Sequence, residues 1–167
     1  YPAFFWLGAA FMLLETKAIT RSAVLYGSTW IVSAVVIGVI LCTILVANLL
    51  AGRLKLGFIK WGYLFLFIAL LAEWWFGPAA CLSLPREVRF LVSSLLVSFP
   101  IFFAGLIFAL SFREVRDTPA ALAANLMGAV VGGILEYVAM LTGFSALSWI
   151  ALALYGLAYR FMLKSSS

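Results

Sequence analysis

The chain has 167 residues, of which 66% are hydrophobic and only 10% are charged. About a quarter of the residues of an ordinary soluble protein are charged, so this composition excludes a water-soluble globular domain. The net charge of +5 does not indicate nucleic-acid binding, because the basic residues are scattered between apolar runs and form no block that could follow a phosphate backbone. The sequence instead predicts an all-α, polytopic transmembrane helical bundle surrounded by the lipid bilayer.

The first apolar segment has two interpretations. Tyr1–Leu14 is too short to cross the roughly 30 Å hydrocarbon core, which needs about 20 apolar residues. Glu15, Lys17 and Arg21 follow it directly. We favour a helix that ends with this run and is followed by an amphipathic stretch at the interface. In the alternative, the helix continues to about Leu25 and the three ionisable groups face protein. Because the chain begins inside an apolar run and without Met, we expect it to be part of a longer polypeptide.

The middle of the chain carries a less regular span. Phe58–Phe76 has Lys60 and Glu73 near its ends, where long side chains can extend to the membrane interface. Pro85 is suited to the start of the next helix, since its fixed φ fits the first helical turn.

The last apolar run is too long for one crossing. Residues 118–159 are interrupted only by Glu136. We expect a break at Gly143, with Ser145 as the N-cap of the final helix. About six spans result, and their predicted bounds are 1–24, 28–52, 58–76, 86–112, 119–142 and 145–163.

The basic residues are distributed unequally between the two ends of the predicted spans. The loops after even-numbered spans hold Arg53, Lys55, Lys60, Arg113, Arg116, Arg160 and Lys164. Those after odd-numbered spans hold only Lys17, Arg21, Arg86 and Arg89. Since Lys and Arg are enriched in cytoplasmic loops, this distribution predicts that both termini are cytoplasmic.

One face of the fifth span carries small and polar residues at spacings of three or four. These residues are Ala121, Asn125, Gly128, Gly132, Glu136 and Ala139. Gly128 and Gly132 form a GxxxG pair, which lets a second helix approach closely. The pattern predicts a tight helix–helix seam, in which Asn125 and Glu136 bond to the neighbouring helix. In an alternative interpretation, Glu136 lines a path for a solute or a proton.

Glu15 and Glu136 are the carboxylates nearest the predicted hydrocarbon region, where a charge is costly enough to indicate a function. On a helix, Lys17 and Arg21 lie roughly opposite Glu15, so a partner for a buried Glu15 must come from another helix. A solvated Glu15 at the interface is the alternative.

The chain has no histidine. Ser and Cys side chains therefore lack their usual catalytic base, and the commonest metal ligand is missing. We expect no catalytic residue, no metal site and no bound cofactor.

Two stretches carry a family resemblance. The first is Gly8–Arg21, followed by Leu25–Trp30, and the second is Asn125–Tyr137, followed by Thr142–Leu147. Together they resemble the membrane region of bacterial spermidine-synthase-like proteins, in which a transporter-like membrane domain is fused to a polyamine-synthase-like domain. The resemblance implies a bacterial cytoplasmic (inner) membrane location. It carries over no catalytic residue, because the family's enzymatic part is a soluble α/β domain and none of the matching positions is catalytic.

Two functions are weighed on these observations. The leading hypothesis is a non-catalytic integral membrane module, either an accessory or scaffold subunit that packs against other integral membrane proteins or the membrane domain of a spermidine-synthase-like protein. The alternative is a solute or ion transporter, or half of one, that uses Glu15 and Glu136.

Overall fold

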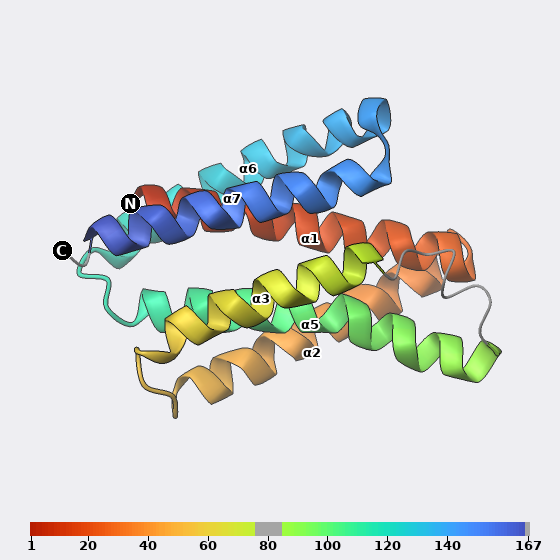
Figure 1. Ribbon diagram of the computed structural model, residues 1–167, viewed down its shortest axis with the longest axis horizontal. Helices are drawn as coiled ribbons and strands as arrows, with labels where there is room; N and C mark the ends of the chain where they lie inside the picture. Colours follow the sequence, from red (N-terminus) through yellow and green to blue (C-terminus); the bar gives the residue numbers. More distant parts are fainter. Residues whose placement is uncertain (76–84, 166–167) are drawn as a thin grey trace.

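The computed structural model describes residues 1–75 and 85–165, and nearly all of these are helical (Figure 1). The helices are α1 (Pro2–Tyr26), α2 (Trp30–Ala51), α3 (Phe58–Trp75), α5 (Arg86–Phe112), α6 (Thr118–Thr142) and α7 (Phe144–Ser165). Each contains a stretch that is long and apolar enough to cross a membrane. The predicted all-α helical bundle is therefore confirmed.

The first helix is longer than expected. α1 continues without interruption from Pro2 to Tyr26, so the interpretation in which it ends with the first apolar run is wrong. The helix can continue because Lys17 and Arg21 turn into the bundle, where their exposed fractions are only 3% and 1%. Their charges thus avoid lipid, which is the condition that the longer helix requires.

Glycines form the turns after α1 and α6. Gly27 has a φ of 94° and Gly143 a φ of 91°, a left-handed conformation that residues with a Cβ rarely adopt. The expected break at Gly143 is present. Because Gly143 itself leaves the helical conformation, α7 already begins at Phe144, and Ser145 is inside that helix rather than its N-cap.

The six helices of the described residues form two groups of three (Figure 1). α1 packs mainly on α6 and α7, whereas α5 packs mainly on α2 and α3. Contacts of α1 with α2 and α5, and of α3 with α7, join the groups. Both chain termini, the α2–α3 connection and the α5–α6 connection lie at one end of the bundle, which we call the terminal end.

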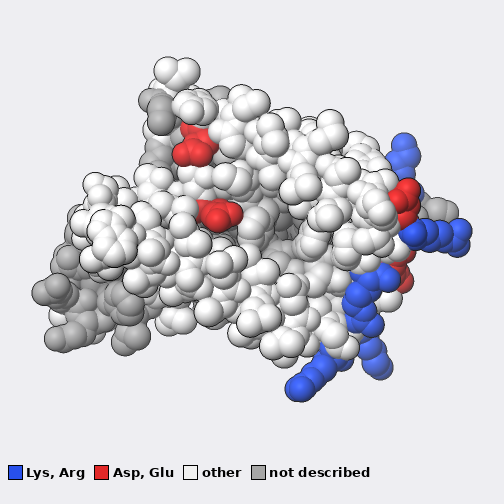
Figure 2. Space-filling view, turned by 180° about the vertical axis from the view of Figure 1, so that it is seen from behind, with Lys and Arg blue, Asp and Glu red and all other residues white. Residues whose placement is uncertain are grey.

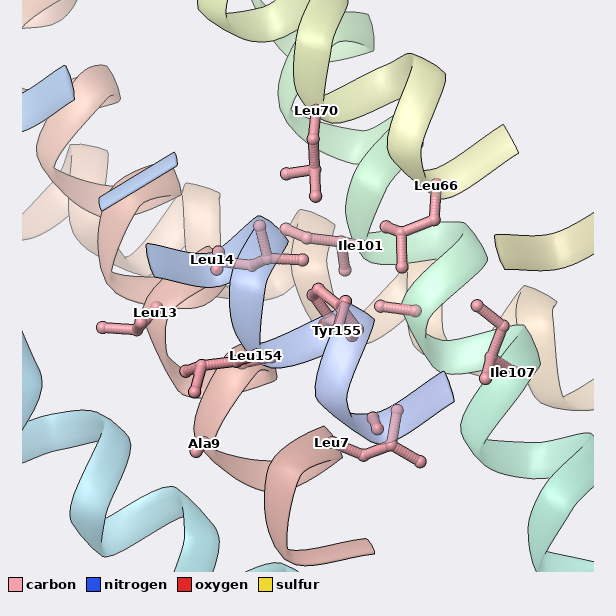
Figure 3. Close-up of a cluster of buried hydrophobic side chains, with 14 of the residues drawn as sticks. Leu7, Ala9, Leu13, Leu14, Leu66, Leu70, Ile101, Ile107, Leu154 and Tyr155 are labelled. Atoms are coloured by element: carbon pink, nitrogen blue, oxygen red, sulfur yellow. The ribbon is translucent and has the colours of Figure 1, made fainter. Parts of the chain in front are cut away.

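A shared core connects the two groups (Figure 3). Leu13 and Leu14 of α1, Leu66 of α3, Ile101 of α5 and Tyr155 of α7 are each no more than 3% exposed. Lipid tails are as apolar as these side chains, so the bundle is held by close van der Waals packing rather than by escape from water.

Arg113 closes the terminal end. Its guanidinium donates hydrogen bonds to the carbonyl oxygens of Ala51 and Leu54, at 2.8 and 3.0 Å. Ala51 is the last residue of α2, where helix carbonyls lack partners within the helix and where the helix dipole favours a cation. Arg113 directly follows α5, so the contact fixes the end of α5 relative to the end of α2.

Candidate functional site

The small-residue seam of α6 lies against α1 of the same chain. A Cβ added to Gly128 would overlap the backbone oxygen of Phe5, and one added to Gly132 would overlap that of Ala9. On the α1 side, a Cβ at Gly8 would overlap the backbone oxygen of Asn125. The two helix backbones therefore touch at positions where only glycine leaves enough room.

Other residues of the seam also lie at the contact between α6 and α1. Ala121 is fully buried. Glu136 is half-buried, and its Oε2 accepts a hydrogen bond from the Thr16 hydroxyl of α1 at 3.1 Å. Ala139 belongs to α6, but its side chain lies outside the described residues. The neighbour of the seam is thus a helix of this chain, which one sequence alone could not establish.

Lys17, Arg21 and Glu73 meet inside the bundle. The Lys17 ammonium lies 2.8 Å from one carboxylate oxygen of Glu73, and a guanidinium nitrogen of Arg21 lies 3.7 Å from the other. The same Arg21 nitrogen donates to the backbone oxygen of Glu73 at 3.4 Å. We call these three residues the buried ion cluster.

The buried ion cluster corrects two expectations. Glu73 was expected to extend to the interface, but only 4% of it is exposed. Lys17 and Arg21 were counted as basic residues of a loop, yet they lie one helical turn apart on the same face of α1 and both turn toward α3. Charges inside a bundle require such pairing, because an isolated charge is very costly there.

Glu15 lies apart from the buried ion cluster. It lines a hollow of about 270 Å³ whose walls come from α1, α2, α5, α6 and α7. Asn48 of α2 and Asn125 of α6 also line this hollow, and most of the remaining lining is apolar. We call the surface of α1, α2, α5 and α6 around the hollow, together with the adjoining Glu136, the hollowed face.

Two acidic side chains stand out among the uncharged residues in Figure 2, which also shows the hollow, whereas the visible Lys and Arg gather at the terminal end. Glu136 of α6 lies at nearly the same level of the bundle as Glu15 of α1, because it accepts a hydrogen bond from Thr16, the residue after Glu15. Both are half-buried, and within the described residues neither forms an ion pair.

Two features of this region, Asn48 and the partners of Glu73, were not predicted. Asn48 is a single amide in a long apolar run, and that departure from the pattern was visible in the sequence. Glu73 pairs with residues more than 50 positions away, and no local pattern signals such a contact. Among the described residues, no group of three or more Cys, Asp and Glu is placed to hold a metal ion.

No family model, curated protein or solved structure matches the chain.

Proposed function

We propose that the chain is a non-catalytic integral membrane module that packs against another membrane-embedded protein or domain through its hollowed face. The supporting observation is the pair of half-exposed carboxylates, Glu15 and Glu136, in an otherwise uncharged part of the surface. The resemblance to spermidine-synthase-like proteins is consistent with this proposal, because there the membrane region is one part of a larger polypeptide.

The cost of exposing a carboxylate to lipid supports a covered face. Glu15 lies about midway along the 25-residue α1. A charged side chain at the centre of a spanning helix costs about 2.5–3.5 kcal/mol on membrane-insertion scales. A protein surface with polar groups would remove this cost, whereas hydrocarbon would not.

The distribution of charge supports an orientation. Seven of the Lys and Arg residues belong to the loops and helix ends at the terminal end. Of the four assigned to the opposite end, Lys17 and Arg21 are paired inside the bundle, so only Arg86 and Arg89 remain. We therefore propose that the terminal end faces the cytoplasm of a bacterial inner membrane.

Photo-crosslinking in the native membrane tests the proposal. A photoreactive residue is placed at Met12, which lines the hollow, and as a control at Leu64, which is exposed on α3. In the natural polypeptide, we expect position 12 to crosslink to a second protein or to a part of the polypeptide outside residues 1–167, and position 64 to lipid. From position 12, crosslinks only to lipid or to α6, which Met12 touches within the bundle, would contradict the proposal.

A second candidate, half of a solute or ion transporter, is favoured by the polar lining of the hollow. Covered by a second half, the hollow would become an enclosed cavity in which Glu15, Asn48 and Asn125 could replace the hydration shell of a small cation. Proteoliposomes loaded with the natural polypeptide would then take up Na⁺, K⁺ or methylammonium, and Glu15→Gln would abolish this uptake. If neither the natural polypeptide nor the Glu15→Gln variant takes up these cations, their transport is excluded.

A further inference from the structure

The hollowed face carries negative groups that the described part of its own chain leaves without a cation. We infer that its partner is a transmembrane helix that places a Lys or Arg side chain opposite Glu15 and Glu136, near the middle of the membrane. This inference rests on the proposed function and adds the chemistry of the partner.

The two carboxylates lie near the middle of the bundle. Glu15 lies midway along α1, and the bond between Glu136 and Thr16 holds the second carboxylate at a neighbouring level. The Thr16 hydroxyl supplies one hydrogen bond, whereas an ionised carboxylate can accept about four. Both groups therefore retain acceptor capacity toward the surface of the bundle.

None of the described cations forms an ion pair with either carboxylate. Lys17 and Arg21 are held by Glu73 in the buried ion cluster. The other described Lys and Arg side chains belong to the loops and helix ends at the terminal end, as Figure 2 shows for those on that face. A second copy of the chain would bring two more carboxylates to the contact and no described cation at this level. Like charges placed opposite one another disfavour such a pairing.

The hollow has space for a long side chain. Ala104 and Gly105 of α5 and Ala129 of α6 form part of its wall, and their small size leaves the space of about 270 Å³. A long side chain from a partner helix can enter this space with its apolar stem against Phe108. The side-chain oxygen of Asn125 could then accept one of the remaining N–H groups of the cation.

The test uses synthetic transmembrane helices as probes. Labelled Leu/Ala peptides of about 20 residues, with Lys, Leu or Glu at the central position, are mixed with the labelled natural polypeptide in phosphatidylcholine vesicles. Association is measured by fluorescence energy transfer. We expect the Lys peptide to associate at least about fivefold more strongly than the Leu peptide, the range of interhelical polar contacts in membranes.

Matched variants assign the preference to the face. Glu15→Gln combined with Glu136→Gln should reduce binding of the Lys peptide to that of the Leu peptide. Glu15→Asp keeps the charge and should retain the preference, as should Glu114→Gln, which lies in the α5–α6 connection. An unchanged helical circular dichroism spectrum of the double variant shows that the loss is not one of folding.

Three results would overturn the inference. They are equal binding of the Lys and Leu peptides to the natural protein, a Lys preference that survives in the double Gln variant, and strongest binding of the Glu peptide. The outcome is separable from that of the crosslinking experiment. Protein crosslinks at position 12 without a Lys preference would remove the inference and leave the proposed function. A Lys preference without those crosslinks would remove the proposed function, and with it the inferred natural partner.

Discussion

At the scale of single residues, the buried ion cluster explains how α1 can be a spanning helix although it carries two cations, Lys17 and Arg21. Lys17 and Arg21 share the carboxylate of Glu73, and Arg21 also bonds to a backbone oxygen in the last turn of α3. Helix carbonyls at that position lack partners within the helix, so the guanidinium serves the backbone as well as the carboxylate. The cluster therefore ties the two groups of helices together.

Removing the shared carboxylate should destabilise the bundle strongly. Glu73→Leu leaves the Lys17 and Arg21 charges inside without the side chain that pairs them, and such a change costs about 3–5 kcal/mol. We expect this loss in the free energy of unfolding, measured by titration with sodium dodecyl sulfate and followed by tryptophan fluorescence. Glu114→Leu, outside the cluster, should change it by less than about 0.5 kcal/mol. A similar small change for both variants would show that the cluster contributes little.

At the scale of elements, the contact between α1 and α6 is a backbone contact. Glycines from both helices bring their main chains together, at Gly8 on one side and at Gly128 and Gly132 on the other. In a bilayer, where no hydrophobic drive holds helices together, this close approach maximises van der Waals attraction. The Thr16–Glu136 hydrogen bond then fixes the register of the two helices.

Two neighbouring glycines of α6 should respond in opposite ways to alanine. In Gly132→Ala the added methyl group would overlap the backbone of α1, and we expect a loss of about 1–3 kcal/mol in the free energy of unfolding. Gly133→Ala meets nothing within 4 Å and should be neutral or stabilising, since alanine favours a helix by about 1 kcal/mol. The same detergent titration compares the two variants, and equal effects would rule out a tight seam at Gly132.

The elements differ in how far the sequence predicts them. The stripe that includes Gly128 and Gly132 follows the helical repeat, so a seam could be expected on that face of α6. The end of α1 could not be predicted in the same way. Extending the helix past Glu15 is favourable only when Glu73 of α3 is in place to pair with Lys17. The hollow was equally hidden, since Glu15, Asn48 and Asn125 come from three helices whose relative rotation no single-chain pattern fixes.

At the scale of the whole molecule, burial of the ion cluster makes the two ends of the bundle more unequal in charge than a count along the sequence indicates. Lys17 and Arg21 no longer contribute to the end opposite the termini, while Arg53, Lys55 and Arg116 remain in loops at the terminal end. Loop charges of this kind set the orientation of a membrane protein.

Cysteine labelling tests the orientation. In a background in which Cys42 and Cys81 are replaced by Ala, Ser28→Cys lies in the α1–α2 turn and Lys55→Cys in the α2–α3 connection. A membrane-impermeant maleimide added to intact cells should label position 28 and should label position 55 only after permeabilisation. The reverse pattern would mean that the terminal end faces outward.

The packing of α1 also has a consequence for biosynthesis. This helix is made before α6 and α7, yet these two are its main neighbours, and its two cations await a carboxylate synthesised about 50 residues later. α2 has no charged residue and can enter lipid as soon as it is made. The packing of α1 can therefore be completed only after the ribosome has made α3, α6 and α7.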